Sequence, residues 1–156
     1  MLTSIAISGT RSTGHRADTD YFQVFADLVA PYAKPGQAVR FYLGGAPGID
    51  TLALRWLAAE TRATLTVVVP ATVAGQPEPA RDAVHAAMAV GRLDVVVELE
   101  RHDFPSIAAY HSRNRYMVDN SEMLIAFPLA TGAAGGTLQT MEYAAVKGLP
   151  RLIVPI

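Results

Sequence analysis

The sequence contains no cysteine, and its charges nearly balance. Without thiols the chain can form neither a disulfide framework nor a thiolate metal site. It has 13 lysines and arginines against 14 aspartates and glutamates, so its formal net charge is -1. The basic residues form no block along the chain. This balance argues against a protein that holds nucleic acid mainly through a broad basic surface, but it leaves a local basic pocket open.

Long apolar runs are also missing. No segment approaches the roughly 20 apolar residues that a membrane-spanning helix needs. The first residues, MLTSIAISGTRS, lack the basic segment and the long apolar stretch of a secretory signal. We therefore expect a cytoplasmic protein without membrane contact. Its 156 residues, 51% of them hydrophobic, predict one domain over residues 1–156 with a core of its own.

Short apolar runs alternate with longer helical patterns along the chain. The predicted strands are Ser4–Ser8, Val39–Leu43, Thr64–Val69, Asp94–Glu98, Glu122–Phe127 and Arg151–Val154. The predicted helices are Thr19–Tyr32, Asp50–Arg62, Ala80–Gly91, Ser106–Asn120 and Thr137–Lys147. Most of the strands are apolar throughout, as in parallel sheets covered on both faces. The alternation predicts an α/β three-layer sandwich with a mainly parallel sheet of about six strands, and a mixed α+β fold is the less favoured alternative.

Three loops that follow predicted strands combine glycines with small or hydroxyl-bearing residues. In a parallel sheet these loops meet at one edge, where ligands bind. Glycine lets the backbone approach a ligand, and the free N–H groups of a following helix attract anions. We predict a phosphate or ribose there, although tight turns without a ligand also use glycine. The candidate binding residues in these loops are Ser8, Gly9, Thr10, Arg11, Gly44, Gly45, Gly48, Asp50, Gly135, Gly136 and Thr137.

Neither the G-x-G-x-x-G dinucleotide pattern nor a P-loop is present, so ordinary NAD-type and ATPase functions lose support. Asp50 and Thr137 each stand where a helix is predicted to begin. For Asp50 we expect an N-cap role, because a carboxylate repels phosphate, with contact to a ribose hydroxyl as the alternative. For Thr137 an N-cap role and a phosphate contact both remain open.

The fourth predicted helix carries polar residues on a face that should pack on the sheet. Asn114 lies on the same stripe as Tyr110 and Met117, and a buried amide needs hydrogen-bond partners. Arg113 and Arg115 flank it. Arginines on a helix are usually solvated. Beside a buried Asn114, however, we predict that Arg113 points toward the ligand edge and supplies the cation that the glycine loops lack.

No metal or cofactor is predicted. The histidines His15, His85, His102 and His111 show no H-x-x-x-H or carboxylate spacing, and we expect them at the surface or in local packing.

Taken in order, four motifs resemble the SLOG superfamily, which joins DNA-processing protein A of natural transformation with the lonely guy phosphoribohydrolases. The motifs are SGTRS, GGAPGID, RNRYMVD and IAFPLATGAAGGTLQTMEYA. The resemblance implies a Rossmann-like SLOG domain that binds a nucleotide or nucleotide-derived ligand at the carboxyl ends of the strands, often in a homodimer. A homo-oligomer is therefore expected.

The match to the phosphoribohydrolases is incomplete. Arg113 and Met117 match their R-K-x-x-M motif, but Thr140 stands where P-G-G-x-G-T-x-x-E has its catalytic glutamate. Glu142 lies two residues further on, about 200° round the helix. Without that carboxylate, glycosidic cleavage by Arg113 and Glu142 is a less favoured alternative. Single-stranded DNA binding, as in DNA-processing protein A, also stays open without being favoured. The leading prediction is a protein that binds a nucleotide-like small molecule.

Overall fold

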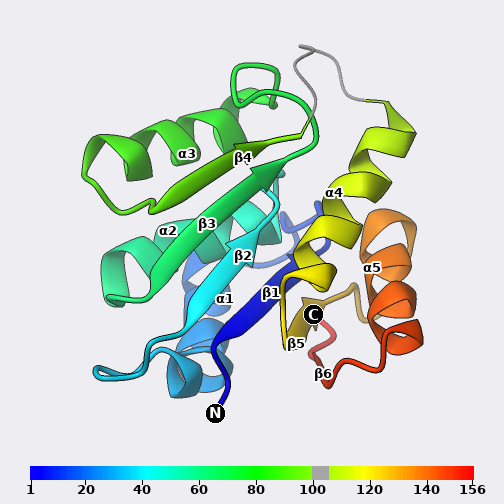
Figure 1. Cartoon of the computed structure of the whole chain (residues 1–156), viewed down its shortest axis with the longest axis horizontal. Helices are drawn as coiled ribbons and strands as arrows, with labels where there is room; N and C mark the ends of the chain where they lie inside the picture. The colour runs from blue at the N-terminus through cyan, green and yellow to red at the C-terminus, as the bar shows by residue number, and fades with distance from the viewer. Residues whose placement is uncertain (100–105) are drawn as a thin grey trace.

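The computed structural model of the chain describes residues 1–99 and 106–156 (Figure 1). The prediction for His102 lies outside these residues. The strands are β1 (Ser4–Gly9), β2 (Arg40–Leu43), β3 (Thr64–Val69), β4 (Val95–Glu98), β5 (Met123–Phe127) and β6 (Arg151–Ile153). The α-helices are α1 (Asp18–Leu28), α2 (Ile49–Glu60), α3 (Glu78–Ala89), α4 (Ile107–Asp119) and α5 (Gly135–Val146), and a 3-10 helix, η1, spans Ala30–Tyr32.

The strands form one six-stranded sheet in the order β4-β3-β2-β1-β5-β6. Every pairing between them is parallel, so the predicted α/β fold with a mainly parallel sheet is confirmed. The chain runs from β1 outward to β4, and then returns to place β5 and β6 on the other side of β1. The strand order therefore reverses beside β1, and such a point is where open α/β sheets bind ligands.

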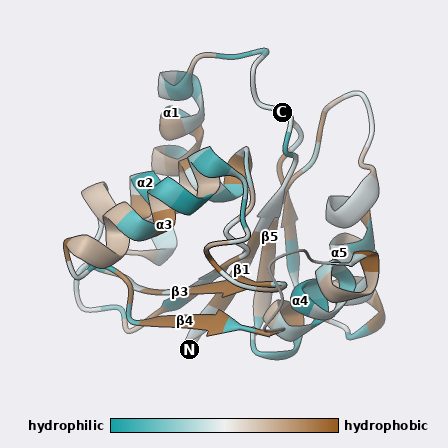
Figure 2. Cartoon of the chain, turned by 90° about the horizontal axis from the view of Figure 1, so that it is seen from above, coloured by the Kyte–Doolittle hydropathy of each residue, from teal (hydrophilic) through white to brown (hydrophobic). Residues whose placement is uncertain are grey.

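The helices form a layer on each face of the sheet (Figure 2). On one face, α1, α2 and α3 share a hydrophobic core with the strands, to which Phe25, Ile49 and Val84 contribute from the helices and Ile5, Ile7 and Val67 from the sheet. The other face is covered by α4 and α5, and its core has smaller strand residues. These core residues include Ala6, Leu124 and Ala126 on the strands and Met117, Val118 and Ala144 on the helices. Crossover connections between parallel strands are right-handed. When the chain reverses the direction in which it adds strands to the sheet, the following helices therefore lie on the opposite face.

Most predicted element bounds differ from the observed ones by a residue or more, and bounds of three helices are among them. Helix α1 ends at Leu28, before Pro31, which occupies the first turn of η1. Helix α3 begins at Glu78, because Pro79 is tolerated in a first helical turn. Helix α5 begins at Gly135, two residues before the predicted start at Thr137.

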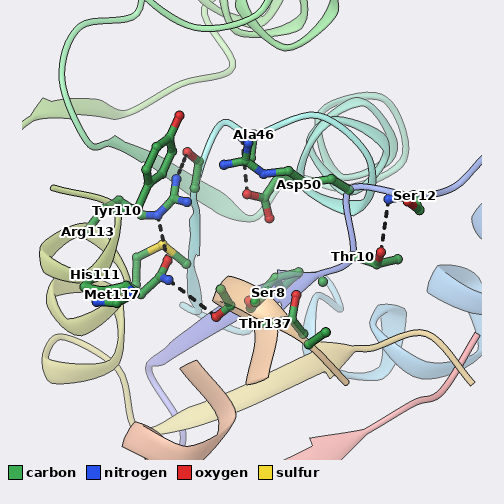
Figure 3. Close-up of a pocket in the computed structure, with 18 of the residues that line it drawn as sticks. Ser8, Thr10, Ser12, Ala46, Asp50, Tyr110, His111, Arg113, Met117 and Thr137 are labelled. Atoms are coloured by element: carbon green, nitrogen blue, oxygen red, sulfur yellow. Dashed lines mark hydrogen bonds between the residues drawn. The ribbon is translucent and has the colours of Figure 1, made fainter. Parts of the chain in front are cut away.

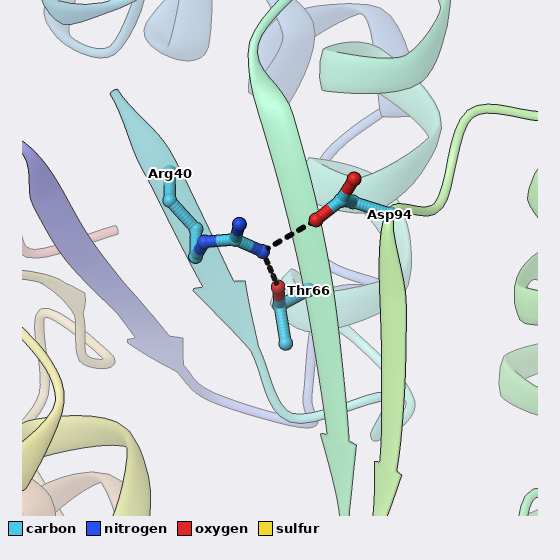
Figure 4. Close-up of polar contacts among 3 residues, drawn as sticks. All are labelled: Arg40, Thr66 and Asp94. Carbon is cyan, nitrogen blue, oxygen red and sulfur yellow. Dashed lines mark hydrogen bonds and ion pairs between the residues drawn. The ribbon is translucent and has the colours of Figure 1, made fainter. Parts of the chain in front are cut away.

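Three strands are joined at their amino-terminal ends by Arg40 of β2 (Figure 4). Its Nη1 donates to Thr66 Oγ1 of β3 at 2.6 Å and to Asp94 Oδ2, just before β4, at 2.9 Å. Thr66 is buried, whereas Asp94 is half-exposed. This cluster lies at the end of the sheet opposite to the glycine loops.

None of the helices in the described part of the chain is both long and apolar enough to span a membrane.

Candidate functional site

A cavity of about 630 Å³ lies at the carboxyl ends of the strands, where the strand order reverses (Figure 3). Its lining comes from the end of β1 and the loop after it, from the loop after β2 with the first turn of α2, from one face of α4, and from the loop after β5 with the start of α5. Most of the residues predicted for the site line it. They are Ser8, Gly9, Thr10, Arg11, Gly44, Asp50, Arg113, Asn114, Gly135, Gly136 and Thr137.

Gly45 and Gly48 are not among the lining residues, and their lack of a side chain has a different cause. Both have positive φ, +64° and +81°. A Cβ on Gly45 would lie 3.0 Å from the Val67 and Val69 side chains, and one on Gly48 would collide with the Thr10 carbonyl oxygen. These two glycines therefore allow the loop to turn and to pack against β3 and against the loop after β1.

Gly44 does face the cavity, but contact with a ligand is not the only reason why this position has no side chain. A Cβ at this position would lie 2.5 Å from Arg113 Nη1 and 2.6 Å from Asp50 Oδ2. The same Nη1 donates a hydrogen bond to the Gly44 carbonyl oxygen. The glycine thus lets two buried charged groups meet the main chain at the end of β2.

Asp50 is not the N-cap that the sequence predicts. The N-cap of α2 is Gly48, and Asp50 lies inside the first turn, where its Oδ2 accepts from the Ala46 N–H at 3.2 Å. The residue is only 6% exposed. Burial raises the pKa of Asp50, although the positive charges of Arg113 and Arg11 and the N–H groups of Ala46 and Gly44 act to lower it.

Arg113 is buried at 5% exposure and lines the cavity from α4. Its Nε donates to Asn114 Oδ1 at 2.8 Å, in addition to the bond to Gly44. Burial lowers the pKa of Arg113, and the nearby Asp50 carboxylate raises it. Arg115, by contrast, is exposed.

Asn114 is buried and hydrogen-bonded, as its place on the packing stripe of α4 predicts. Its Nδ2 donates to Gln139 Oε1 at 3.1 Å and, at 3.4 Å, to the Gly136 carbonyl oxygen. Because its Oδ1 accepts a hydrogen bond from Arg113 Nε, Asn114 connects the guanidinium to the first turn of α5.

The start of α5 opens into the cavity without a cap. Its N-cap residue is Ala134, whose side chain makes no capping bond, so Thr137 is not the N-cap. In the described part of the chain, no group accepts hydrogen bonds from the N–H groups of Gly135, Gly136 and Thr137. Amides in this arrangement carry the positive end of the helix dipole.

The cavity is also lined by Tyr110, His111 and Met117, for which the sequence predicts no binding role. Tyr110 and Met117 lie on the stripe expected to pack on the sheet, and His111 was expected at the surface or in local packing. The Arg11 guanidinium carbon lies 4.9 Å from the Tyr110 ring centre, and that of Arg113 lies 5.8 Å from it. Spacing along the sequence does not show which side of this stripe faces the loops.

Glu142 is exposed on α5 and is not among the residues that line the cavity. Thr140, at the position of the catalytic glutamate in the phosphoribohydrolases, is fully buried and donates to the Gly136 carbonyl oxygen at 2.7 Å. Asp50 is the carboxylate that lines the cavity within residues 1–99 and 106–156. Over those same residues, no group of three or more potential ligands is placed to hold a metal ion.

Comparison with known families gives one match over the chain. The model of the family described as DNA recombination-mediator protein A matches residues 1–156. This range includes all the loops and helices that form the cavity. Comparison with curated proteins finds no match.

Proposed function

Because the chain belongs to the DNA recombination-mediator protein A family, we propose that its cavity binds a nucleotide or nucleotide-derived ligand through the ligand's phosphate. The family match confirms the resemblance to the superfamily that contains DNA-processing protein A. The nature of the ligand is our inference from the cavity.

One observation carries the proposal: the uncapped start of α5 and the buried Arg113 open into the same cavity. Free N–H groups at a helix start favour an anion, and phosphate is the usual one. The Thr137 hydroxyl faces the same space (Figure 3) and can donate to a phosphate oxygen. Arg113 and the exposed Arg11 also line the cavity and supply positive charge.

The cavity also has room for more than a phosphate. About 630 Å³ falls within the size range of small-molecule sites. Apolar or aromatic contacts are available from Ile7, Tyr110 and Met117. A phosphorylated nucleoside, with one charged end and one flat ring, suits this combination of surfaces.

Titration calorimetry with inorganic phosphate, AMP, ADP and ADP-ribose tests the proposal. Thr137→Val keeps the shape of the side chain and removes one hydroxyl, so we expect binding to weaken by about threefold to tenfold. Thr19→Val, an exposed change on α1, is the matched control and should leave the affinity unchanged. Equal affinities of Thr137→Val and the wild type for every probe that binds would reject the phosphate position.

Single-stranded DNA binding is a second candidate, and the family match favours it. In that case the phosphate at α5 would belong to a DNA strand, and the exposed Arg11 would contact the backbone. Retardation of an oligonucleotide should then weaken steeply as salt increases, because bound counterions are released. An unshifted oligonucleotide at low salt and micromolar protein excludes this candidate.

Glycosidic cleavage has less support, since Glu142 lies outside the cavity lining and Thr140 is buried. Incubation with AMP followed by chromatography for free adenine tests it against Glu142→Gln. A homo-oligomer and a cytoplasmic location stay predictions, and analytical ultracentrifugation measures the first.

A further inference from the structure

Only one of the two carboxylate oxygens of Asp50 accepts a hydrogen bond from the described part of the protein. Its Oδ2 accepts from the Ala46 N–H, but its Oδ1 is buried and has no hydrogen-bond partner within the described residues. A buried carboxylate oxygen without a donor costs free energy, and native structures rarely leave one unexplained. Asp50 lines the cavity, so a ligand can supply the missing donor.

Neither Arg113 nor the Gly44 N–H, which lies near enough to act on the pKa of Asp50, makes a hydrogen bond to Oδ1 within the described residues. The Nη1 and Nε of Arg113 donate to the Gly44 carbonyl oxygen and to Asn114 Oδ1. The guanidinium is thereby held beside Gly44, on the same side as Asp50 Oδ2. Asp50 Oδ1 therefore has a fixed position, because helix α2 holds the backbone of Asp50 and the Ala46 N–H holds its other carboxylate oxygen.

The orientation of this oxygen indicates what it can bind. In Figure 3 the Asp50 oxygen that does not contact Ala46 is directed toward the side of the cavity where Ser8 and Thr137 lie. An ionised carboxylate oxygen accepts hydrogen bonds and donates none, so it repels a phosphate and attracts an O–H or N–H group. The cavity thus combines an anion position at α5 with a donor-seeking position at Asp50.

A sugar phosphate carries both complementary groups within one small unit. We infer that Asp50 Oδ1 accepts a hydrogen bond from a sugar hydroxyl, so that the cavity selects a ribose phosphate over its dideoxy counterpart. This inference rests on the phosphate position proposed above. It also separates a free ribonucleotide from an internal DNA nucleotide, which has no free sugar hydroxyl.

The experiment compares AMP with 2′,3′-dideoxyadenosine 5′-monophosphate, which share the base and the phosphate. Affinities are measured by ¹⁵N NMR titration, which also covers weak binding. At a pH above the raised pKa of Asp50, where its carboxyl group is ionised, we expect the wild type to bind AMP about tenfold more tightly or better, since the bond then involves a charged acceptor in a buried place.

The test variant is Asp50→Asn. Its amide oxygen must stay on the Ala46 N–H, so it presents an NH₂ group to the cavity in place of a charged acceptor. The preference for AMP should fall below about threefold, while inorganic phosphate should bind at least as well as to the wild type, because a negative charge has been removed. Asp82→Asn, on the exposed side of α3, is the control and should keep the wild-type preference.

The outcomes separate the two proposals. The role of Asp50 is refuted if the wild type binds both nucleotides equally, or if Asp50→Asn keeps the full preference for AMP. In either case the proposed phosphate position survives, provided that Thr137→Val still weakens binding. If neither nucleotide nor inorganic phosphate binds, the phosphate position and the role of Asp50 are both refuted.

Discussion

Gly44 lies between two buried charged side chains, the guanidinium of Arg113 and the carboxylate of Asp50. Each of these groups is held by a main-chain contact, Arg113 at the Gly44 carbonyl oxygen and Asp50 at the Ala46 N–H. At the scale of single residues, the chemistry of the cavity therefore depends on a position that has no side chain of its own.

Replacing Gly44 by Ala should disturb both charged groups at once. The new Cβ would lie 2.5 Å from Arg113 Nη1 and 2.6 Å from Asp50 Oδ2, which is too close for either to stay in place. We expect the free energy of unfolding to fall by about 1–3 kcal/mol, as for other overpacked sites, and phosphate binding to weaken. Urea unfolding and calorimetry measure the two effects.

Gly14→Ala is the matched control, because no atom lies within 4 Å of a Cβ at Gly14. The two variants should differ clearly in stability. Equal stability would mean that Arg113 and Asp50 move aside at little cost.

Asp50→Asn should change how stability depends on pH. Burial raises the pKa of Asp50 in the folded state, so the native protein holds this proton more tightly than the unfolded chain does. Stability is therefore lost as pH rises from the unfolded value, about 4, to the higher folded pKa. Asp50→Asn has no carboxyl group at this position and does not lose stability in this way. The difference between its free energy of unfolding and that of the wild type should therefore increase, in favour of the variant, as pH rises over that interval.

Urea unfolding at pH values from 4 to 8 measures this difference. Asp82→Asn serves as the control for the loss of one carboxylate at an exposed position. A difference between Asp50→Asn and the wild type that stays constant, or shrinks as pH rises, contradicts the prediction.

At the scale of helices and strands, the ends of the elements decide what the molecule can bind. The start of α5 is left without a cap and faces the cavity, whereas the end of α2 is capped by a distant side chain. The guanidinium of Arg92 donates to the carbonyl oxygens of Ala58, Thr61 and Ala63 at 3.0–3.2 Å. One helix end is therefore satisfied by the fold, and the other is available to an anion.

Arg92→Ala should destabilise the protein by about 1–3 kcal/mol, because it leaves the carbonyl groups at the end of α2 without their charged donor. Arg92→Lys should restore only part of this, since an ammonium cannot span the same set of oxygens. Thermal and urea unfolding measure both changes. The exposed Arg62→Ala is the control, and a loss of similar size there would assign the effect to charge and not to capping.

At the scale of the whole molecule, the cavity exists because the chain reverses its direction across the sheet. The outward run from β1 to β4 and the return to β5 bring the loops after β1 and β5 together, at opposite ends of the sequence. The parallel pairing of Gly9 with Phe127 continues into a bond from the Thr10 N–H to the Phe127 carbonyl oxygen at 3.0 Å. Helix α4, which makes the return crossing, adds Arg113 and Asn114 to these loops.

The sequence by itself determined the α/β fold, the strands and the edge that carries the cavity. Apolar runs and helical periodicity are local properties, and parallel strands bring their following loops to one edge. The positions of Gly44, Arg113, Asn114 and the α5 glycines in the cavity agree with the predicted set. Their binding roles stay predictions.

Only the tertiary structure decided the use of each polar or glycine residue at that edge. Gly45 and Gly48 serve packing, Thr137 lies inside α5, and Asp50 keeps one oxygen free. These distinctions depend on which neighbours reach each atom from distant parts of the chain. Spacing along the sequence sets the face on which a residue lies, but hydrogen-bond partners and burial arise from packing between elements, and these determine whether a polar group is satisfied by the fold or left for a ligand.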